Sequence, residues 1–230
     1  MAIEKIELKN FRGFSNLTLE GVRRINIIVG PNGSGKTALM EGIKNYAGGY
    51  ILIAPGTFPP RSARENFESL PSKKKQIFID IMEKIFPDVE DVGMGNEWQG
   101  LLIYFKRLKK PIFISELSHG FNQIAGILLM ITKERNSIAL IDEIENGIHF
   151  TKYEMVLQAI DELSRDFGKQ IFFTTHSNDI LDTFCRTSCF EENDFSIIRC
   201  SREESGATSA TIVSDEWAAR ALDSGIEIRV

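Results

Sequence analysis

The sequence predicts an α/β fold in which helices flank a mixed, mainly parallel β-sheet. Three apolar runs have the length and the residue types of buried strands, and they lie at residues 24–29, 137–141 and 170–174. Each run is followed along the chain by a segment whose apolar residues have helical spacing. Strands that alternate with helices in this way are typical of a parallel sheet covered by helices.

Length and composition favour a single domain over residues 1–230, because 43% of its 230 residues are hydrophobic and can supply a core. No apolar run approaches the ~20 residues of a membrane-spanning helix, and the N-terminus has no signal-peptide core. We therefore expect a cytoplasmic protein without a membrane partner. The three cysteines are an odd number without zinc-site spacing, which favours reduced thiols.

The formal net charge of −5 argues against a protein that coats nucleic acid through bulk charge. Two short basic runs lie at residues 73–75 and 107–110. Such runs are usually solvated faces, although they leave a local basic patch open.

The N-terminal segment predicts two antiparallel strands. Residues 2–8 and 14–19 alternate between apolar and polar side chains, and Asn10 to Gly13 between them have the composition of a turn. We expect these strands to form a small antiparallel β subdomain before the first buried strand.

Residues 30–37 read G-x-x-x-x-G-K-T, the Walker A or P-loop pattern, between a strand and a helix. Backbone N–H groups of such a loop form an anion-binding nest at the positive end of a helix dipole. Lys36 adds a charge for the β- and γ-phosphates, and Thr37 offers a hydroxyl to Mg²⁺. A chance glycine-rich turn is the alternative, and the correct flanking elements argue against it. The pattern predicts a nucleoside triphosphate site formed by Asn32, Gly33, Ser34, Gly35, Lys36, Thr37 and Ala38.

Residues from about 50 to 115 are predicted to form a mixed insertion. A short apolar run at 51–54 is followed by prolines and glycines, up to Arg61, that break regular structure. Residues 72–86 have helical spacing, Gly93, Gly95 and Gly100 indicate turns, and 101–105 with 112–114 predict a hairpin.

The segment Glu116 to Gln123 opens a helix, and we expect residues 117–134 to contain a long apolar helix. Ser118 and Gly120 would place a hydroxyl and a bare backbone at its N-terminus, which makes a second anion site. One nucleotide cannot easily contact both its own P-loop and this segment, so a second subunit would have to supply it. An ordinary serine cap is the alternative explanation.

The buried strand at 137–141 ends in Asp142-Glu143, which is a Walker B pattern. Beside a P-loop, Asp142 can hold Mg²⁺ directly or through water. Glu143 points differently and can polarise the water that attacks the γ-phosphate. Without a P-loop, the same pair would favour an ordinary helix N-terminus.

The strand at 170–174 runs into His176, which can bridge the γ-phosphate and the attacking water. A structural histidine is the alternative. The order of the P-loop, the S-x-G segment, the Asp-Glu pair and His176 along one domain favours the catalytic role.

The remaining elements complete the sheet and its covering helices. An amphipathic helix is expected at 151–167 with Gly168 after it, and Ser177 or Asn178 can cap the next helix. A terminal hairpin is expected at 195–200 and 208–214, and a short helix at 215–222.

The order of these motifs resembles that of the ABC-type ATPases, and the details resemble the RecF, SMC and OLD-like branch. Asn10-Phe11-Arg12-Gly13-Phe14 is similar to the N-F-R-x-F motif of that branch. Residues 25–37 resemble its strand and P-loop, residues 141–149 its Walker B and D-loop block, and residues 174–177 its switch histidine. The match extends over nearly the whole chain.

This resemblance implies an ABC-like ATPase head that binds ATP with Mg²⁺ and pairs head to tail with a second copy around two nucleotides. Ser118 and Gly120 would contact the γ-phosphate bound by the opposite subunit, and Arg12 would lie on the nucleotide side. Glu145 and Asn146 would lie at the interface of an ATP-dependent homodimer. The implied catalytic residues are Glu143, His176 and Lys36, and the implied Mg²⁺ ligands are Thr37 and Asp142.

Two features depart from the family pattern. The signature reads Leu-Ser-His-Gly instead of Leu-Ser-Gly-Gly, which fits the OLD-like subgroup. No glutamine of a Q-loop follows a convincing strand, and Gln76 lies within an expected helix.

Residues 37–118 are too few for the long coiled-coil arms of SMC proteins. Only a hairpin and a short helix are expected after His176, so we expect no Toprim nuclease domain.

The expected activity is ATP hydrolysis that regulates a separate partner in DNA repair or anti-phage defence. The resemblance implies a nuclease, another toxic effector or DNA as that partner. A nucleotide-sensing scaffold with little hydrolysis is one alternative, and the ATPase subunit of a transporter is another.

Overall fold

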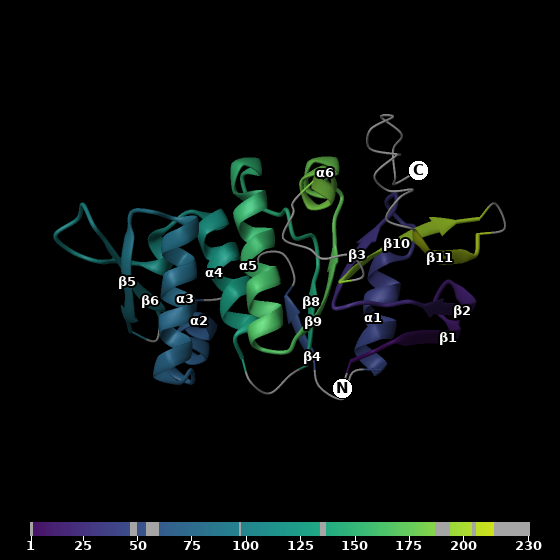
Figure 1. Ribbon diagram of the computed structural model, residues 1–230, viewed down its shortest axis with the longest axis horizontal. Coiled ribbons are helices and arrows are strands. Elements are labelled where there is room, and N and C mark those ends of the chain that lie inside the picture. Colours follow the sequence, from purple (N-terminus) through teal and green to yellow (C-terminus); the bar gives the residue numbers. More distant parts are fainter. Residues whose placement is uncertain are drawn as a thin grey trace.

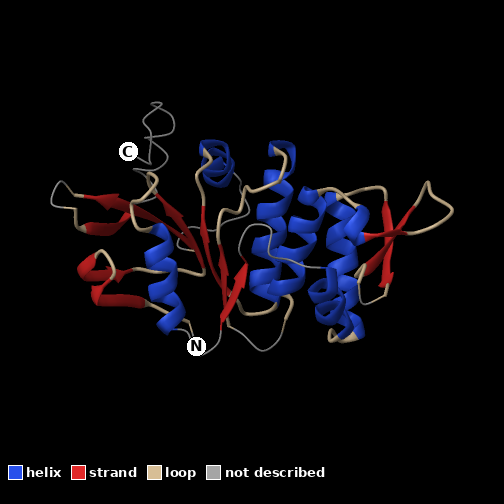
Figure 2. Cartoon of the chain, turned by 180° about the vertical axis from the view of Figure 1, so that it is seen from behind, coloured by secondary structure: helices blue, strands red, loops and turns tan. Residues whose placement is uncertain are grey.

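The computed structural model describes residues 2–46, 50–53, 60–96, 98–133, 137–186, 194–203 and 206–213. Within these ranges the chain forms an elongated molecule with a six-stranded sheet at its centre (Figure 1). A two-stranded sheet lies towards one end and a three-stranded sheet at the other (Figure 2). The predicted α/β class is confirmed.

The central sheet has the strand order β11-β10-β3-β9-β8-β4. All neighbouring strands are parallel except β10 and β11. Every residue of β3, β8 and β9 is buried, because both faces of the sheet are covered, and this explains the uninterrupted apolar runs in the sequence. The six strands are β3 (Ile25–Val29), β4 (Tyr50–Ile53), β8 (Ile138–Ile141), β9 (Gln170–Thr174), β10 (Phe195–Arg202) and β11 (Thr208–Val213).

Helix α1 (Lys36–Tyr46) and the antiparallel pair β1 (Lys5–Phe11) and β2 (Phe14–Glu20) cover one face of the sheet (Figure 1). Apolar residues of α1 at helical spacing, such as Leu39 and Ile43, pack into one core with the inner sides of β1 and β2. The predicted N-terminal strand pair is confirmed, although β1 begins at Lys5 and extends to Phe11.

Helices α4 (His119–Ile131), α5 (Tyr153–Asp166) and α6 (Asn178–Arg186) belong to a second core on the other face. Most residues of α4 are buried because it lies between the sheet and the helices of the lobe (Figure 1). Helix α4 lies within the expected segment 117–134, and it begins after Ser118, whose hydroxyl caps it by accepting from Phe121 N at 3.3 Å. Ser177 caps α6 in the same way, accepting from Ile180 N.

The lobe at the far end contains α2 (Pro60–Glu68), α3 (Ser72–Ile85) and the sheet β5 (Val89–Met94), β6 (Leu101–Phe105) and β7 (Ile112–Phe113). Its buried side chains, including Phe78 and Ile103, join the core that contains α4 and α5. The predicted hairpin is confirmed by the antiparallel pairing of β6 with β7.

Several sequence-based expectations were wrong in detail. The break in regular structure that we expected to last until Arg61 ends earlier, because α2 begins at Pro60. The fixed φ of proline suits a first helical turn. Strand β5 was missed because Gly93 within it and Gly95 just after it indicated turns. The segment expected to be helical from residue 151 forms a 3₁₀ turn at Phe150–Lys152 before α5 begins. The expected helix at 215–222 lies outside the described residues.

Cys185 and Cys200 are free thiols, as expected, and Cys189 lies outside the described residues. Gln76 lies in α3, where its side chain bonds to Asp80. None of the helices in the described ranges is both long enough and apolar enough to cross a membrane.

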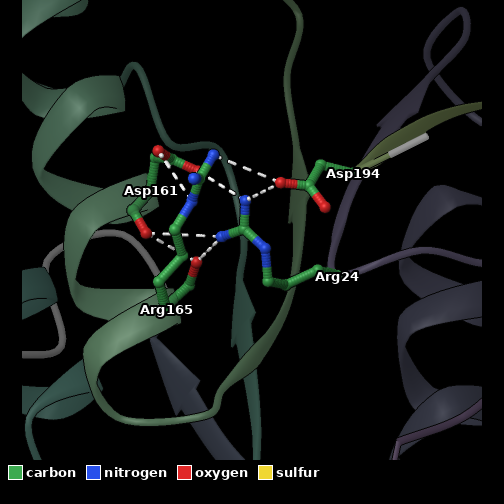
Figure 3. A network of polar contacts seen from close by, with 5 residues as sticks. Arg24, Asp161, Arg165 and Asp194 are labelled. Atoms are coloured by element: carbon green, nitrogen blue, oxygen red, sulfur yellow. Dashed lines mark hydrogen bonds and ion pairs between the residues drawn. The ribbon is translucent and has the colours of Figure 1, made fainter. Parts of the chain in front are cut away.

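A polar network fastens the amino ends of two sheet strands to α5 (Figure 3). Arg24, directly before β3, contacts Asp161 Oδ1 at 2.6 Å and Asp194 Oδ2 at 2.8 Å. The Arg24 side chain is 20% exposed and that of Asp161 only 9%. Arg165 also contacts both carboxylates, and Ser164 accepts from Arg24. This network lies at the opposite ends of the strands from the P-loop.

We expect Arg24→Met to destabilise the fold by about 2–4 kcal/mol, because it leaves the mostly buried Asp161 with a weaker partner. Lys84→Met is a matched control, because the Lys84–Glu162 pair at 2.9 Å is 62% and 44% exposed. Its loss should cost less than about 1 kcal/mol. Urea unfolding of both variants measures the difference, and equal midpoints would show that the network contributes little.

Candidate functional site

An open pocket of about 460 Å³ lies at the carboxyl edge of the central sheet. Its walls come from the segments that follow β3, β8 and β9. The carboxyl edge is the usual place for ligands in open α/β sheets. The lining residues are Asn32, Gly33, Gly35, Lys36, Thr37, Asp142, Glu143 and His176.

The P-loop has the backbone that an anion-binding loop requires. Gly30 has φ 145°, and a Cβ there would lie 2.2 Å from the carbonyl oxygen of Cys200 on β10, so only glycine fits. The first backbone bond of α1 joins Leu39 N to Gly35 O at 2.8 Å. The N–H groups of residues 36–38 therefore belong to the first helical turn, where they have no intrahelical acceptor. Phosphate oxygens can satisfy them.

Lys36 is 6% exposed, and its ammonium donates to Gly30 O at 2.8 Å and to Pro31 O at 2.9 Å. Burial lowers the pKa of Lys36, and the nearby carboxylates of Asp142, Glu143 and Glu145 oppose that shift. Burial also raises the pKa of the Cys200 thiol to about 12, so that it stays protonated at neutral pH. Among the described residues the ammonium of Lys36 has no ion-pair partner, and such a buried cation favours the arrival of an anion such as a phosphate.

Thr174 at the end of β9 connects the Walker B residues. Its buried hydroxyl donates to Asp142 Oδ1 at 2.6 Å and accepts from Glu143 N at 2.8 Å. The Asp142 carboxylate and the exposed Thr37 hydroxyl both line the pocket. These two hard oxygen donors suit Mg²⁺, which usually takes one or two carboxylates together with substrate phosphates.

Glu143 has φ 48°, which is rare for a residue with a side chain. Its Oε1 lies 3.8 Å from Nε2 of His176, and both side chains are partly exposed to the pocket. A carboxylate and an imidazole this close can hold one water molecule between them and a phosphate.

Three predicted P-loop and N-terminal residues do not line the pocket. Ser34 is buried beneath the loop, and its N–H donates to Pro31 O at 3.2 Å. The side chain of Ala38 packs on the core below α1. Arg12, in the β1–β2 turn, forms an ion pair with Glu41 of α1.

Ser118 and Gly120 also lie outside the lining of this pocket. Both are at the N-terminus of α4, and the Ser118 side chain is exposed. A Cβ at Gly120 would lie 2.3 Å from the carbonyl oxygen of Gly147. The signature segment is therefore packed against the turn that follows Walker B in the same chain.

Sequence reasoning missed the part played by Thr174 and by the β10–β11 hairpin behind the P-loop. Thr174 stood within the switch-histidine motif, but its bonds to Asp142 and Glu143 join residues about thirty positions apart. The hydroxyl residue at the end of a buried strand is the signal that could have indicated the role of Thr174.

The comparisons with known proteins agree with this geometry. The model of the AAA domain family AAA_23 matches residues 5–205. The DNA replication and repair protein RecF of Idiomarina loihiensis is 43% identical over 65 residues, which are 28% of this chain and 17% of that protein. The match thus spans less than a fifth of that relative.

Two solved structures share the fold at low sequence identity. The SMC head domain from Thermotoga maritima has a TM-score of 0.64 and 14% identity, with 93% of this chain and all of that chain covered. An SMC head bound to the C-terminal winged-helix domain of ScpA has a TM-score of 0.66 and 14% identity, over 96% of this chain and 100% of that chain. The chain belongs to the AAA domain family AAA_23 and has the ABC-type ATPase head fold of the RecF and SMC branch.

Proposed function

We propose that the chain binds ATP with Mg²⁺ and hydrolyses it. The observation that carries this proposal is the single pocket that joins Lys36, Asp142, Glu143 and His176 from the ends of three neighbouring strands. A phosphate-binding loop alone would fit any nucleotide-binding protein, whereas the additional carboxylate and imidazole suit activation of a water molecule.

The pocket residues have separate roles in phosphate binding, metal binding and activation of water. Lys36 and the N–H groups of residues 36–38 hold the β- and γ-phosphates. Thr37 and Asp142 would hold Mg²⁺, and the ion would neutralise charge on the phosphate oxygens. Glu143 orients the attacking water and accepts its proton, and His176 donates a hydrogen bond to the γ-phosphate beside it.

A second copy of the chain would complete the site. Ser118 and Gly120 offer a hydroxyl and backbone N–H groups at a helix N-terminus, yet they lie outside the pocket formed by their own chain. A head-to-tail pair would bring each signature segment to the γ-phosphate held by the other P-loop. Arg12, beside α1, would then lie near the edge of the nucleotide site.

The partner is proposed from the relatives. The RecF name supports a role in DNA repair over one in phage defence. The SMC head solved with ScpA supports a separate protein partner. A nuclease or toxin as that partner rests on the family resemblance alone, and the OLD-like subgroup rests on the Leu117-Ser118-His119-Gly120 signature.

Phosphate release at steady state tests the enzyme against the alternative of a nucleotide-sensing scaffold. We expect release from ATP that requires Mg²⁺, stops with EDTA and depends on Glu143. Nucleotide binding without any release that depends on Glu143 would favour the scaffold.

A further inference from the structure

Four hydrogen bonds connect the turn after β8, residues 142–146, to Thr174 and His176 at the end of β9. Two involve the Thr174 hydroxyl, which joins Asp142 and Glu143. A third runs from Ile144 N to Thr174 O at 3.1 Å. The fourth runs from His176 N to Glu145 Oε1 at 2.5 Å. Together they continue the pairing of the two strands beyond their last ladder residues, Ile141 and Phe173.

The turn needs such restraint because Glu143 has left-handed backbone geometry. For a residue with a side chain this conformation costs roughly 1–2 kcal/mol, and it persists only where surrounding contacts hold it. Asn146 N donates to Glu143 O at 2.9 Å and closes the turn. The turn is therefore held at its start by Thr174 and at its far side by the contact of Glu145 with His176.

The side chain of Glu145 makes a hydrogen bond with the backbone of His176. Its Oε1 accepts from His176 N, while its Oε2 is buried and has no hydrogen-bond partner among the residues that the structure describes. Tyr153 of α5 adjoins this carboxylate; burial raises the pKa of Tyr153, and its hydrogen bond with Ser177 opposes the shift. The Glu145 carboxylate thus lies between the turn after β8 and the residues that follow β9.

We propose that Glu145 is a positioning residue that fixes His176 relative to Glu143. Through one hydrogen bond to the backbone of His176, it sets the imidazole 3.8 Å from the carboxylate of Glu143. Glu145 does not line the nucleotide pocket, so it acts through these two residues and not by contact with ATP.

This proposal rests on ATP hydrolysis as the function of the site, and it differs from the interface role that the family resemblance implies for Glu145. An interface residue would change dimer formation. A positioning residue within the chain changes the rate of the chemical step and leaves the P-loop intact. A 1 Å misplacement of reacting groups can lower a rate about 100-fold.

The test compares Glu145→Ala with Glu145→Gln. The alanine variant removes the acceptor of His176 N, and we expect kcat to fall about 10- to 100-fold while ATP affinity and KM stay within about 2-fold. The glutamine variant keeps an amide oxygen that can accept the same bond, so we expect it to retain most of kcat. Glu154→Ala is the matched control, because Glu154 is exposed and its carboxylate accepts a hydrogen bond from the Gln158 side chain one turn along the same helix.

A double-mutant cycle with His176→Ala, measured in single-turnover experiments, completes the test. If Glu145 acts through His176, Glu145→Ala should have less than about a 2-fold further effect in that background. An unchanged kcat for Glu145→Ala, an effect confined to KM, failure of glutamine to rescue, or additive effects in the cycle would overturn the proposal. Absence of hydrolysis by the unsubstituted protein would instead overturn the proposed function.

Discussion

Glu143→Gln is expected to bind ATP as tightly as the unsubstituted chain and to release phosphate about 10²- to 10⁴-fold more slowly, which is the usual contribution of a general base. The substitution keeps the size of the side chain and the Glu143 N bond to Thr174, since that bond is made by the backbone. It removes only the carboxylate that lies 3.8 Å from His176 Nε2.

Because ATP then stays intact, the Glu143→Gln protein should accumulate as ATP-bound dimers. Light scattering with ATP and Mg²⁺ measures this, and ADP provides the control. A Glu143→Gln protein that stays monomeric in ATP would contradict the composite site. One that still turns over ATP at the unsubstituted rate would contradict the role of Glu143 as the base.

Lys36→Ala is expected to weaken ATP binding roughly 10- to 100-fold, since a hydrogen bond to a charged group contributes about 1.5–3 kcal/mol. The variant also loses the hydrogen bonds from the ammonium to Gly30 O and Pro31 O, which hold the shape of the loop. It should therefore stay monomeric at ATP concentrations that pair the Glu143→Gln protein.

Isothermal titration with ATP and Mg²⁺ measures the loss in Lys36→Ala. Lys44→Ala is the matched control, because Lys44 lies in the last turn of the same helix, far from its N-terminus. The two variants should differ by at least about 10-fold in ATP affinity. Equal affinities would show that the P-loop lysine does not contact the nucleotide.

The motifs that lie within short segments could be predicted from the sequence. The P-loop, the Asp142-Glu143 pair and His176 each follow an apolar run, and buried parallel strands must carry such runs because both of their faces are covered. Since the carboxyl ends of parallel strands meet at one edge, the three motifs had to converge there. The pocket at that edge is lined by residues from all three.

The contacts between those motifs could not be predicted in the same way. Thr174 and Glu145 act through hydrogen bonds to residues about thirty positions away, and a local pattern does not record which loop faces which. Strand β5 was missed because Gly93 and Gly95 indicated turns, although Gly93 pairs with Leu102 in the sheet. Tertiary pairing overrides such local preferences.

Mixing two inactive variants tests most directly whether the catalytic site is shared between copies. Lys36→Ala disables the P-loop, and Ser118→Asp places a negative charge at the γ-phosphate while aspartate can still cap α4. In a head-to-tail pair of the two variants, one site joins both substitutions and the other site has neither.

Each variant alone should release phosphate near background, and an equimolar mixture should recover activity, because each mixed dimer has one intact site of two. Fully random pairing, in which half of the dimers are mixed, sets the expected upper value at about one quarter of the unsubstituted rate. No recovery at any mixing ratio, with mixed dimers present in a tagged pull-down, would contradict the shared site.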